Sequence, residues 1–217
     1  MKMSLLQPRI IRGDIEHNLE VVQRLADEAR GDLLVLPEYV LTGSLVLDLR
    51  ADARDWARRS ADAKRRISVP SSKYLLVNTL VEIDDTLRNC CELLPTGEFQ
   101  FKLFPDEAEQ NAGILPGTEQ KIFELLGKSF KAVICSDIRH MNKIPTDGLD
   151  FLAFIYHFTD NNFPGVMSSA RNVSKERKLP VLVSSLVSDR NNGFSSFVNS
   201  DVVVSLSKLE GILEIEI

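Results

Sequence analysis

Residues 132–139 of the chain read AVICSDIR, and two comparable runs come earlier: LLVLPEY at residues 33–39 and FQFKLF at residues 99–104. Each run is largely apolar, which is typical of a strand buried on both faces. Each run also carries one reactive side chain at or near its end: Glu38, Lys102 or Cys135. Because charged groups are rarely placed against a core unless they are paired or used, the three runs predict a functional site at strand ends.

The rest of the chain alternates between helical and extended patterns. Apolar residues at helical spacing predict helices over residues 15–29, 51–66 and 164–178. Apolar runs bounded by turn residues predict strands over 4–12, 33–37, 74–83, 88–94, 98–104, 120–126, 130–135, 149–155, 181–184, 194–206 and 211–217. Residues 105–118 are polar and contain Gly113, Pro116 and Gly117, so we expect a loop. This order indicates an α/β protein, but periodicity does not choose between a doubly wound sheet and two stacked sheets.

Composition limits the class of protein. A length of 217 residues predicts one domain, 1–217, and a net charge of -5 argues against a nucleic-acid or anionic-membrane partner. The three cysteines and three histidines lack the spacing of a disulfide framework or a metal site. We therefore expect neither metal nor cofactor. The start of the chain does not resemble a signal peptide, and no apolar run approaches the roughly 20 residues of a membrane helix. The sequence thus predicts a cytoplasmic protein.

The order Glu38, Lys102, Cys135, with these flanks, resembles the nitrilase superfamily of carbon–nitrogen hydrolases. The resemblance extends along nearly the whole chain, through Gln7, Asn18-Leu19, Thr42-Gly43, Leu115-Pro116-Gly117, Gly193-Phe194-Ser195 and residues 209–213. It implies a four-layer α-β-β-α sandwich of the nitrilase type. The chain departs from the family pattern after Arg139, where His140-Met141-Asn142 stands in place of an aromatic residue and a Pro-Glu pair.

The resemblance also implies a chemistry: hydrolysis of a non-peptide carbon–nitrogen bond in a small linear amide through a Cys thioester. A thiol needs a base before it attacks, which suits Glu38, while Lys102 supplies positive charge. Lys102 and the backbone N–H of Ser136 would stabilise the tetrahedral anion. Glu109 is expected as a second carboxylate, with Glu107 as the alternative. The remaining expected support comes from Asp137 and Arg139, which would hold the loop after the nucleophile Cys135.

Other interpretations remain open at this point. Amidase is preferred over carbamoyl-amide hydrolase and nitrilase, because no motif in the chain points to nitriles. A catalytically degenerate protein that binds a ligand or partner is the alternative from a different class. By itself Cys135 could be an inert core residue, and His140 or His157 could form a Cys–His dyad with it. The expected partners are a small-molecule amide substrate and a second copy of the chain, since the family habit favours a homodimer.

Overall fold

The computed structural model describes residues 1–44, 51–156 and 162–217. Its strands are β1 (Lys2–Gln7), β2 (Leu33–Val35), β3 (Tyr74–Ile83), β4 (Thr86–Leu94), β5 (Glu98–Phe101), β6 (Phe123–Leu125), β7 (Lys128–Ile134), β8 (Phe151–Ile155), β9 (Val181–Ser184), β10 (Ser196–Asn199), β11 (Val202–Ser205) and β12 (Gly211–Glu216). Its helices are α1 (Ile15–Glu28), α3 (Ala53–Arg65), α4 (Glu107–Asn111) and α5 (Phe163–Arg177), with a 3-10 segment, η1 (Cys135–Lys143).

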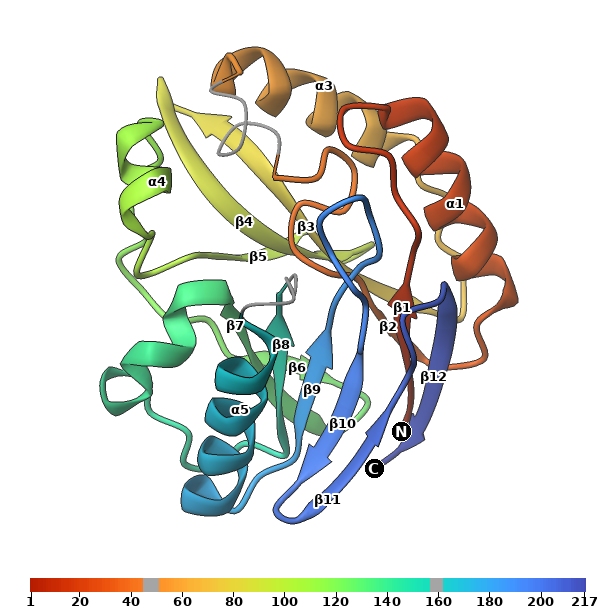
Figure 1. Ribbon diagram of the computed structural model, residues 1–217, viewed down its shortest axis with the longest axis vertical. Helices are drawn as coiled ribbons and strands as arrows, with labels where there is room; N and C mark the ends of the chain where they lie inside the picture. Colours follow the sequence, from red (N-terminus) through yellow and green to blue (C-terminus); the bar gives the residue numbers. More distant parts are fainter. Residues whose placement is uncertain (45–50, 157–161) are drawn as a thin grey trace.

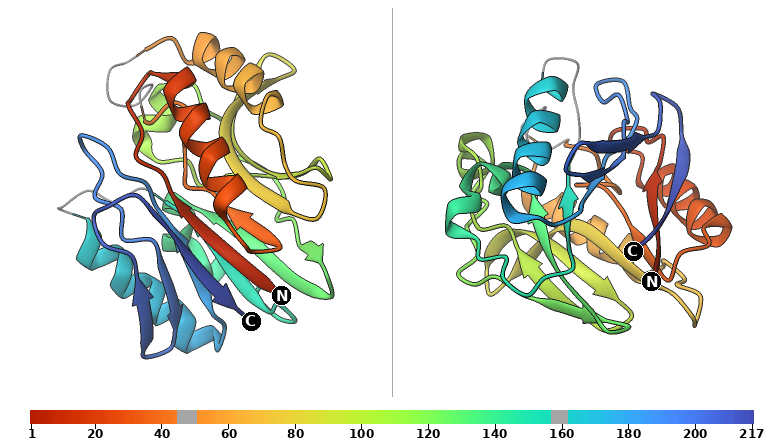
Figure 2. Two further views of the ribbon diagram at one scale, coloured as in Figure 1. Left: turned by 90° about the vertical axis from the view of Figure 1, so that its right-hand side faces the viewer. Right: turned by 90° about the horizontal axis from the view of Figure 1, so that it is seen from below.

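Two six-stranded sheets lie face to face, with helices on both outer sides (Figures 1 and 2). The strand orders are β12-β1-β2-β3-β4-β5 in the first sheet and β11-β10-β9-β8-β7-β6 in the second. The two sheets bury apolar residues such as Leu5, Val35, Phe130 and Phe151 between them. The four-layer α-β-β-α sandwich is therefore confirmed, and the doubly wound alternative is wrong.

Each outer helix layer is held by an apolar stripe. Val22 and Leu25 of α1 pack on residues of the first sheet that include Leu34. On the other side, Ala170 and Val173 of α5 pack on the outer face of the second sheet. Because successive strand residues face opposite sides, continuously apolar strands such as β2 and β8 can be covered on both faces, as their sequences predict.

Strand direction gathers the site at one edge of the sandwich. β2 and β3 pair in parallel, and β4 and then β5 each reverse direction, so β5 runs the same way as β2. Glu38 comes shortly after β2, and Lys102 directly after β5. Both residues therefore lie beyond the carboxyl ends of these two strands, on the same side of the first sheet. Cys135 follows β7 in the second sheet.

Several predicted boundaries are corrected by the structure. The expected loop 105–118 contains α4, which begins at a capping box in which Asp106 accepts from the backbone of Glu109. The expected strand 4–12 ends at Gln7, before Pro8, and the expected strand 194–206 is two strands that turn at Ser200, where φ is 54°. Among the helices that the structure describes, none has both the length and the apolar character needed to cross a membrane.

Candidate active site

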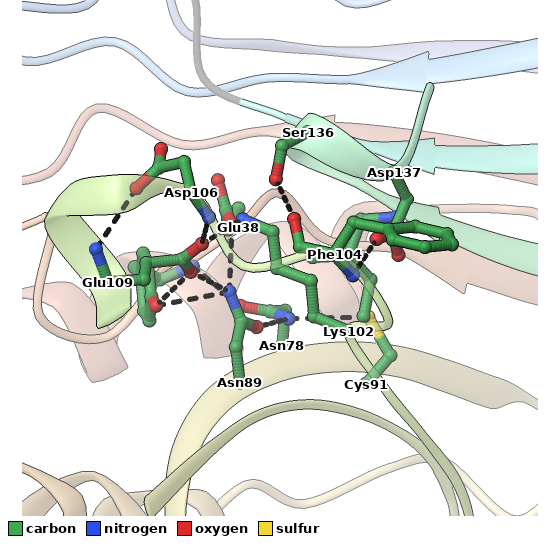
Figure 3. Close-up of polar contacts among 12 residues, drawn as sticks. Glu38, Asn78, Asn89, Cys91, Lys102, Phe104, Asp106, Glu109, Ser136 and Asp137 are labelled. Atoms are coloured by element: carbon green, nitrogen blue, oxygen red, sulfur yellow. Dashed lines mark hydrogen bonds and ion pairs between the residues drawn. The ribbon is translucent and has the colours of Figure 1, made fainter. Parts of the chain in front are cut away.

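The sequence places Glu38, Lys102 and Glu109 on three separate segments, and the fold brings them into one buried cluster (Figure 3). The Lys102 ammonium lies 3.1 Å from Glu38 Oε1 and 2.6 Å from Glu109 Oε2. All three side chains are at most 1% exposed. One ammonium thus forms ion pairs with two carboxylates in a site from which bulk water is excluded.

The structure puts Glu109 beside Lys102 and leaves Glu107 exposed. Glu109 occupies the third position of α4, where the capping box turns its side chain back so that Oε2 accepts from the backbone N–H of Asp106 at 3.0 Å. Its Oε1 accepts from the Tyr39 hydroxyl at 2.8 Å. The spacing Asp106-x-x-Glu109 is a capping-box signal in the sequence, and it distinguishes Glu109 from Glu107.

Two asparagines that sequence reasoning missed complete the cluster. Asn89 of β4 donates from Nδ2 to Glu38 Oε1 at 2.8 Å and to Glu109 Oε1 at 2.9 Å. Asn78 of β3 donates to Asn89 Oδ1 at 2.7 Å. Both asparagines lie within strands, and each has a polar neighbour, Thr79 after Asn78 and Arg88 before Asn89, so the local sequence did not mark them as buried.

Strained backbone marks the two turns that carry the reactive groups. Cys135 has φ of 47° and Tyr39, which follows Glu38, has φ of 51°. The left-handed region is uncommon for residues other than glycine, and such strain concentrates at functional sites. At Cys135 the turn ends β7 and begins η1, and the side chain remains partly exposed.

The charge of the cluster sets the proton affinities around it. Burial opposes the charge of Lys102, but Glu38, Cys135 and Glu109 outweigh this and raise the pKa of the ammonium well above its usual range. Burial, with the negative charge of Glu38, raises the pKa of the Cys135 thiol well above its usual range, although Lys102 opposes the shift. The cluster already carries two carboxylates against one ammonium, so Cys135 rests as a thiol. Lys102 favours the thiolate, as expected, but burial and the carboxylates outweigh it.

Asp137 ties the cysteine turn to the lysine segment. Its buried carboxylate accepts from the backbone N–H of Phe104 at 2.8 Å, of Leu103 at 3.2 Å and of Ile134 at 3.3 Å. Ser136 adds a second link, since its hydroxyl donates to the carbonyl of Phe104 at 2.5 Å. Figure 3 shows this clamp beside the carboxylate cluster.

Among the remaining predicted residues, the structure describes Arg139 and His140. Arg139 is exposed and acts electrostatically on Tyr156, and its support of the loop after Cys135 stays a prediction. The ring of His140 stacks on Phe104 with centroids 4.2 Å apart. His157, the other candidate for a Cys–His dyad, lies outside the described residues. Within the described ranges, no three His, Cys, Asp or Glu side chains are grouped as metal ligands would be.

The Asp137 carboxyl gives a prediction for stability. Burial raises its pKa to about 6, against opposing hydrogen bonds from the backbone of Phe104 and Leu103. The folded state therefore binds this proton more tightly than the unfolded state does. Its stabilising contribution is complete below the ordinary aspartate range and is lost as pH rises through about 6.

We accordingly expect the free energy of unfolding of the native chain, minus that of Asp137→Asn, to fall by about 2–3 kcal/mol between pH 4 and pH 7. Denaturant unfolding at each pH measures this difference, and other titrations cancel because both chains share them. A difference that stays constant over this range would contradict the raised pKa of Asp137.

Comparison with known proteins gives fold neighbours only. No family model and no curated protein matches the sequence. Among solved structures, the chain is similar to a glutamine-dependent NAD+ synthetase from Acinetobacter baumannii, with a TM-score of 0.83, 18% identity, and coverage of 98% of this chain but 44% of the synthetase. It is also similar to an amidase of the nitrilase superfamily from Nesterenkonia, with a TM-score of 0.83 and 16% identity over 100% of this chain and 90% of the amidase.

A third neighbour is a CN-hydrolase superfamily protein from Xanthomonas campestris with an arsenic adduct in its active site. It has a TM-score of 0.79 and 16% identity, and the match covers 99% of this chain and 89% of that protein. At these identities the comparisons establish the arrangement of the backbone. The chain has the fold of the nitrilase superfamily of carbon–nitrogen hydrolases.

Proposed function

We propose that the protein is a carbon–nitrogen hydrolase that cleaves a small linear amide, with Cys135 as nucleophile and Glu38 as general base. The observation that carries this proposal is the buried Glu38–Lys102–Glu109 cluster, because two carboxylates and an ammonium are costly to bury unless they are paired and used. The nitrilase-type fold supports it. So does the acrylamide found added to the active-site cysteine in a structure of the Nesterenkonia amidase.

The first half of the reaction moves one proton within the cluster. As the sulfur of Cys135 attacks the amide carbon, its proton passes to Glu38, so the site never holds a third full negative charge. The negative charge moves to the substrate oxygen, where the third N–H of Lys102 and the backbone N–H of Ser136 would receive it. Glu38 then gives its proton to the departing nitrogen, which leaves as ammonia, and a thioester remains on Cys135.

The second half uses the same base. Glu38 takes a proton from a water molecule, and the hydroxide so formed attacks the thioester carbon. Collapse of this intermediate breaks the carbon–sulfur bond, releases the carboxylic acid and returns the proton to Cys135. Glu109 accepts four hydrogen bonds, from Tyr39, Asn89, Asp106 and Lys102. Because these donors occupy both of its oxygens and one of them is the ammonium, we assign Glu109 the role of holding Lys102 in place.

An ammonia-release screen over short linear amides, carbamoyl compounds and nitriles tests the proposal. We expect release from at least one short amide, dependent on Cys135. Activity confined to carbamoyl compounds or nitriles would move the protein to another reaction type of the same family. No release from any class, with Cys135 inert to alkylating agents, would favour the alternative of a non-catalytic binding protein.

The homodimer also stays a prediction, which rests on the resemblance to the family. Light scattering at micromolar concentration should give twice the monomer mass of 24.4 kDa. A monomer mass at that concentration would remove the prediction without affecting the site, since every residue of the proposed cluster comes from one chain.

A further inference from the structure

Two buried asparagines connect the backbone beside Glu38 to the carboxylates of the cluster (Figure 3). Asn78 Oδ1 accepts from the backbone N–H of Tyr39 at 2.9 Å, and Asn78 Nδ2 donates to Asn89 Oδ1 at 2.7 Å. Asn89 Nδ2 then donates to Glu38 Oε1 and Glu109 Oε1. The path begins one residue after Glu38 and returns to the Glu38 side chain, so it forms a closed loop of hydrogen bonds.

The order of donors and acceptors fixes which way each amide points. A backbone N–H can only donate, so the atom of Asn78 that faces Tyr39 must be its oxygen. The nitrogen of Asn78 then faces Asn89, which must present its own oxygen in return. The Asn89 nitrogen is thereby directed at both carboxylates. The reversed amide would set a carbonyl oxygen against two carboxylate oxygens, which repel it.

We propose that Asn78 is a positioning residue, which through Asn89 holds a hydrogen-bond donor on Glu38 and so sets the proton affinity of the base. This inference rests on the proposed function, in which Glu38 receives the thiol proton. Asn78 is fully buried and touches neither the reactive thiol nor the ammonium in any described contact; it acts through Asn89. Its other contact, at 3.4 Å, is with the sulfur of Cys91.

The predicted effect is on the pH dependence of the site. A donor stabilises the ionised form of a carboxylate, so losing it favours the protonated form of Glu38. The other titratable or charged groups that act on Glu38 or are acted on by it are Tyr39, Cys91, Lys102, Glu109, Cys135 and Tyr156. Replacing Asn78 keeps all of these groups in the chain, although Tyr39 and Cys91 each lose their hydrogen bond to Asn78. The measured quantity is the acidic limb of the pH profile, the pH range over which the reactivity of Cys135 falls as Glu38 becomes protonated.

The test uses the alkylation of Cys135 by iodoacetamide across pH, which needs no substrate. The variants are Asn78→Leu, Asn89→Leu and the double replacement. Thr79→Val is the matched control, because Thr79 is the next residue of β3, faces away from Asn78, and has a buried hydroxyl without a hydrogen-bond partner. Peptide mapping separates Cys135 from Cys90 and Cys91.

We expect the acidic limb of the Cys135 alkylation rate to move up by about one pH unit in Asn78→Leu, which is a tenfold change in proton affinity. Asn89→Leu and the double variant should show the same shift, since both asparagines act on Glu38 through one donor. Thr79→Val should leave the limb unchanged. On a confirmed substrate, kcat should fall at pH values below the shifted limb while KM changes little.

A shift in Asn89→Leu alone, or additive shifts in the double variant, would overturn the role of Asn78. A second measurement needs no variant: in the native protein, the side-chain amide NMR signals of Asn78 and Asn89 should titrate together at the pH of the limb. Those of Asn18, which is buried and bonded to backbone carbonyls elsewhere, should not move. Titration of Asn89 without Asn78 would also overturn the inference.

The two proposals fail in different ways. If no amide is hydrolysed but the acidic limb of Cys135 alkylation shifts in the asparagine variants, the proposed function is wrong and the positioning role of Asn78 stands. If amides are hydrolysed through Cys135 and the acidic limb does not move, the positioning role of Asn78 is wrong and the proposed function stands. A native Cys135 that reacts no faster than the buried Cys90 and Cys91 would overturn both.

Discussion

Replacing Cys135 by alanine is expected to lower kcat by about 10⁵- to 10⁶-fold, the loss typical of a covalent nucleophile. Cys135 is partly exposed, and its sulfur makes no described hydrogen bond, so the variant should unfold at nearly the same denaturant concentration as the native protein. Retention of near-normal turnover on a confirmed substrate would contradict the assignment of the nucleophile.

The covalent intermediate gives this prediction a direct readout. Acid quenching in the steady state, with a substrate that deacylates slowly, should leave an acyl adduct on the protein in intact-mass analysis. Peptide mapping should place it on the segment that contains Cys135. An adduct on Cys90 or Cys91 would reassign the nucleophile. A pre-steady-state burst without any cysteine adduct would indicate direct attack by water, and Cys135 would then be an inert residue.

Replacing Lys102 by methionine is expected to reduce both activity and stability. The ammonium lies between Glu38 and Glu109, and all three groups are buried. Removing it leaves two carboxylates without a counter-charge, which costs about 3–5 kcal/mol of the free energy of unfolding. It also removes an oxyanion donor, worth about 10²- to 10³-fold in kcat. Guanidinium unfolding and steady-state kinetics measure the two losses separately.

A matched double variant separates the structural role of Lys102 from its chemical role. Lys102→Met with Glu109→Gln removes one of the uncompensated charges and keeps one oxygen, which at the position of Oε1 still accepts from Tyr39 and Asn89. We expect it to recover at least half of the lost stability and none of the lost activity. Recovery of activity would show that Lys102 serves only to neutralise charge. In a Cys135→Ala background, replacing Lys102 should cost little further activity, because the groups act as a unit.

Glu38 and Cys135 could be singled out from the sequence because each follows a continuously apolar run that forms a buried strand. Runs of this kind identify strands without any knowledge of their partners, and a charge at the end of one is costly enough to be noticed. For the run before Lys102 the expectation of burial on both faces is wrong, because Phe99 of β5 is 48% exposed. The same reasoning missed α4, because a helix of five residues is too short to show a periodic pattern of apolar residues. The capping-box spacing from Asp106 to Glu109 was the one sequence feature that indicated the start of this helix.

Asn78 and Asn89 lay beyond sequence reasoning for a physical reason. They belong to adjacent strands, and the antiparallel register sets Leu80 opposite Asn89 and Asn78 opposite Cys91, so the two amides become diagonal neighbours only when the strands pair. The sequence of either strand alone does not determine the register of this pair. The resting state of Cys135 was likewise undetermined, because the direction of its pKa shift depends first on burial and then on the balance between nearby carboxylates and the ammonium.

The sequence by itself determined most of the alternation of strands and helices, because local patterns of burial carry it. It also singled out Glu38, Lys102 and Cys135 as candidates, through their flanks and the resemblance to the nitrilase superfamily, and their roles stay a proposal. Only the tertiary structure decided that the sheets stack as two layers, that Glu38 and Glu109 share the Lys102 ammonium, and that Asn78 and Asn89 are hydrogen-bonded to each other and to this cluster. These features depend on strand pairing and sheet packing, which join residues 11 to 70 positions apart through contacts that no local pattern encodes.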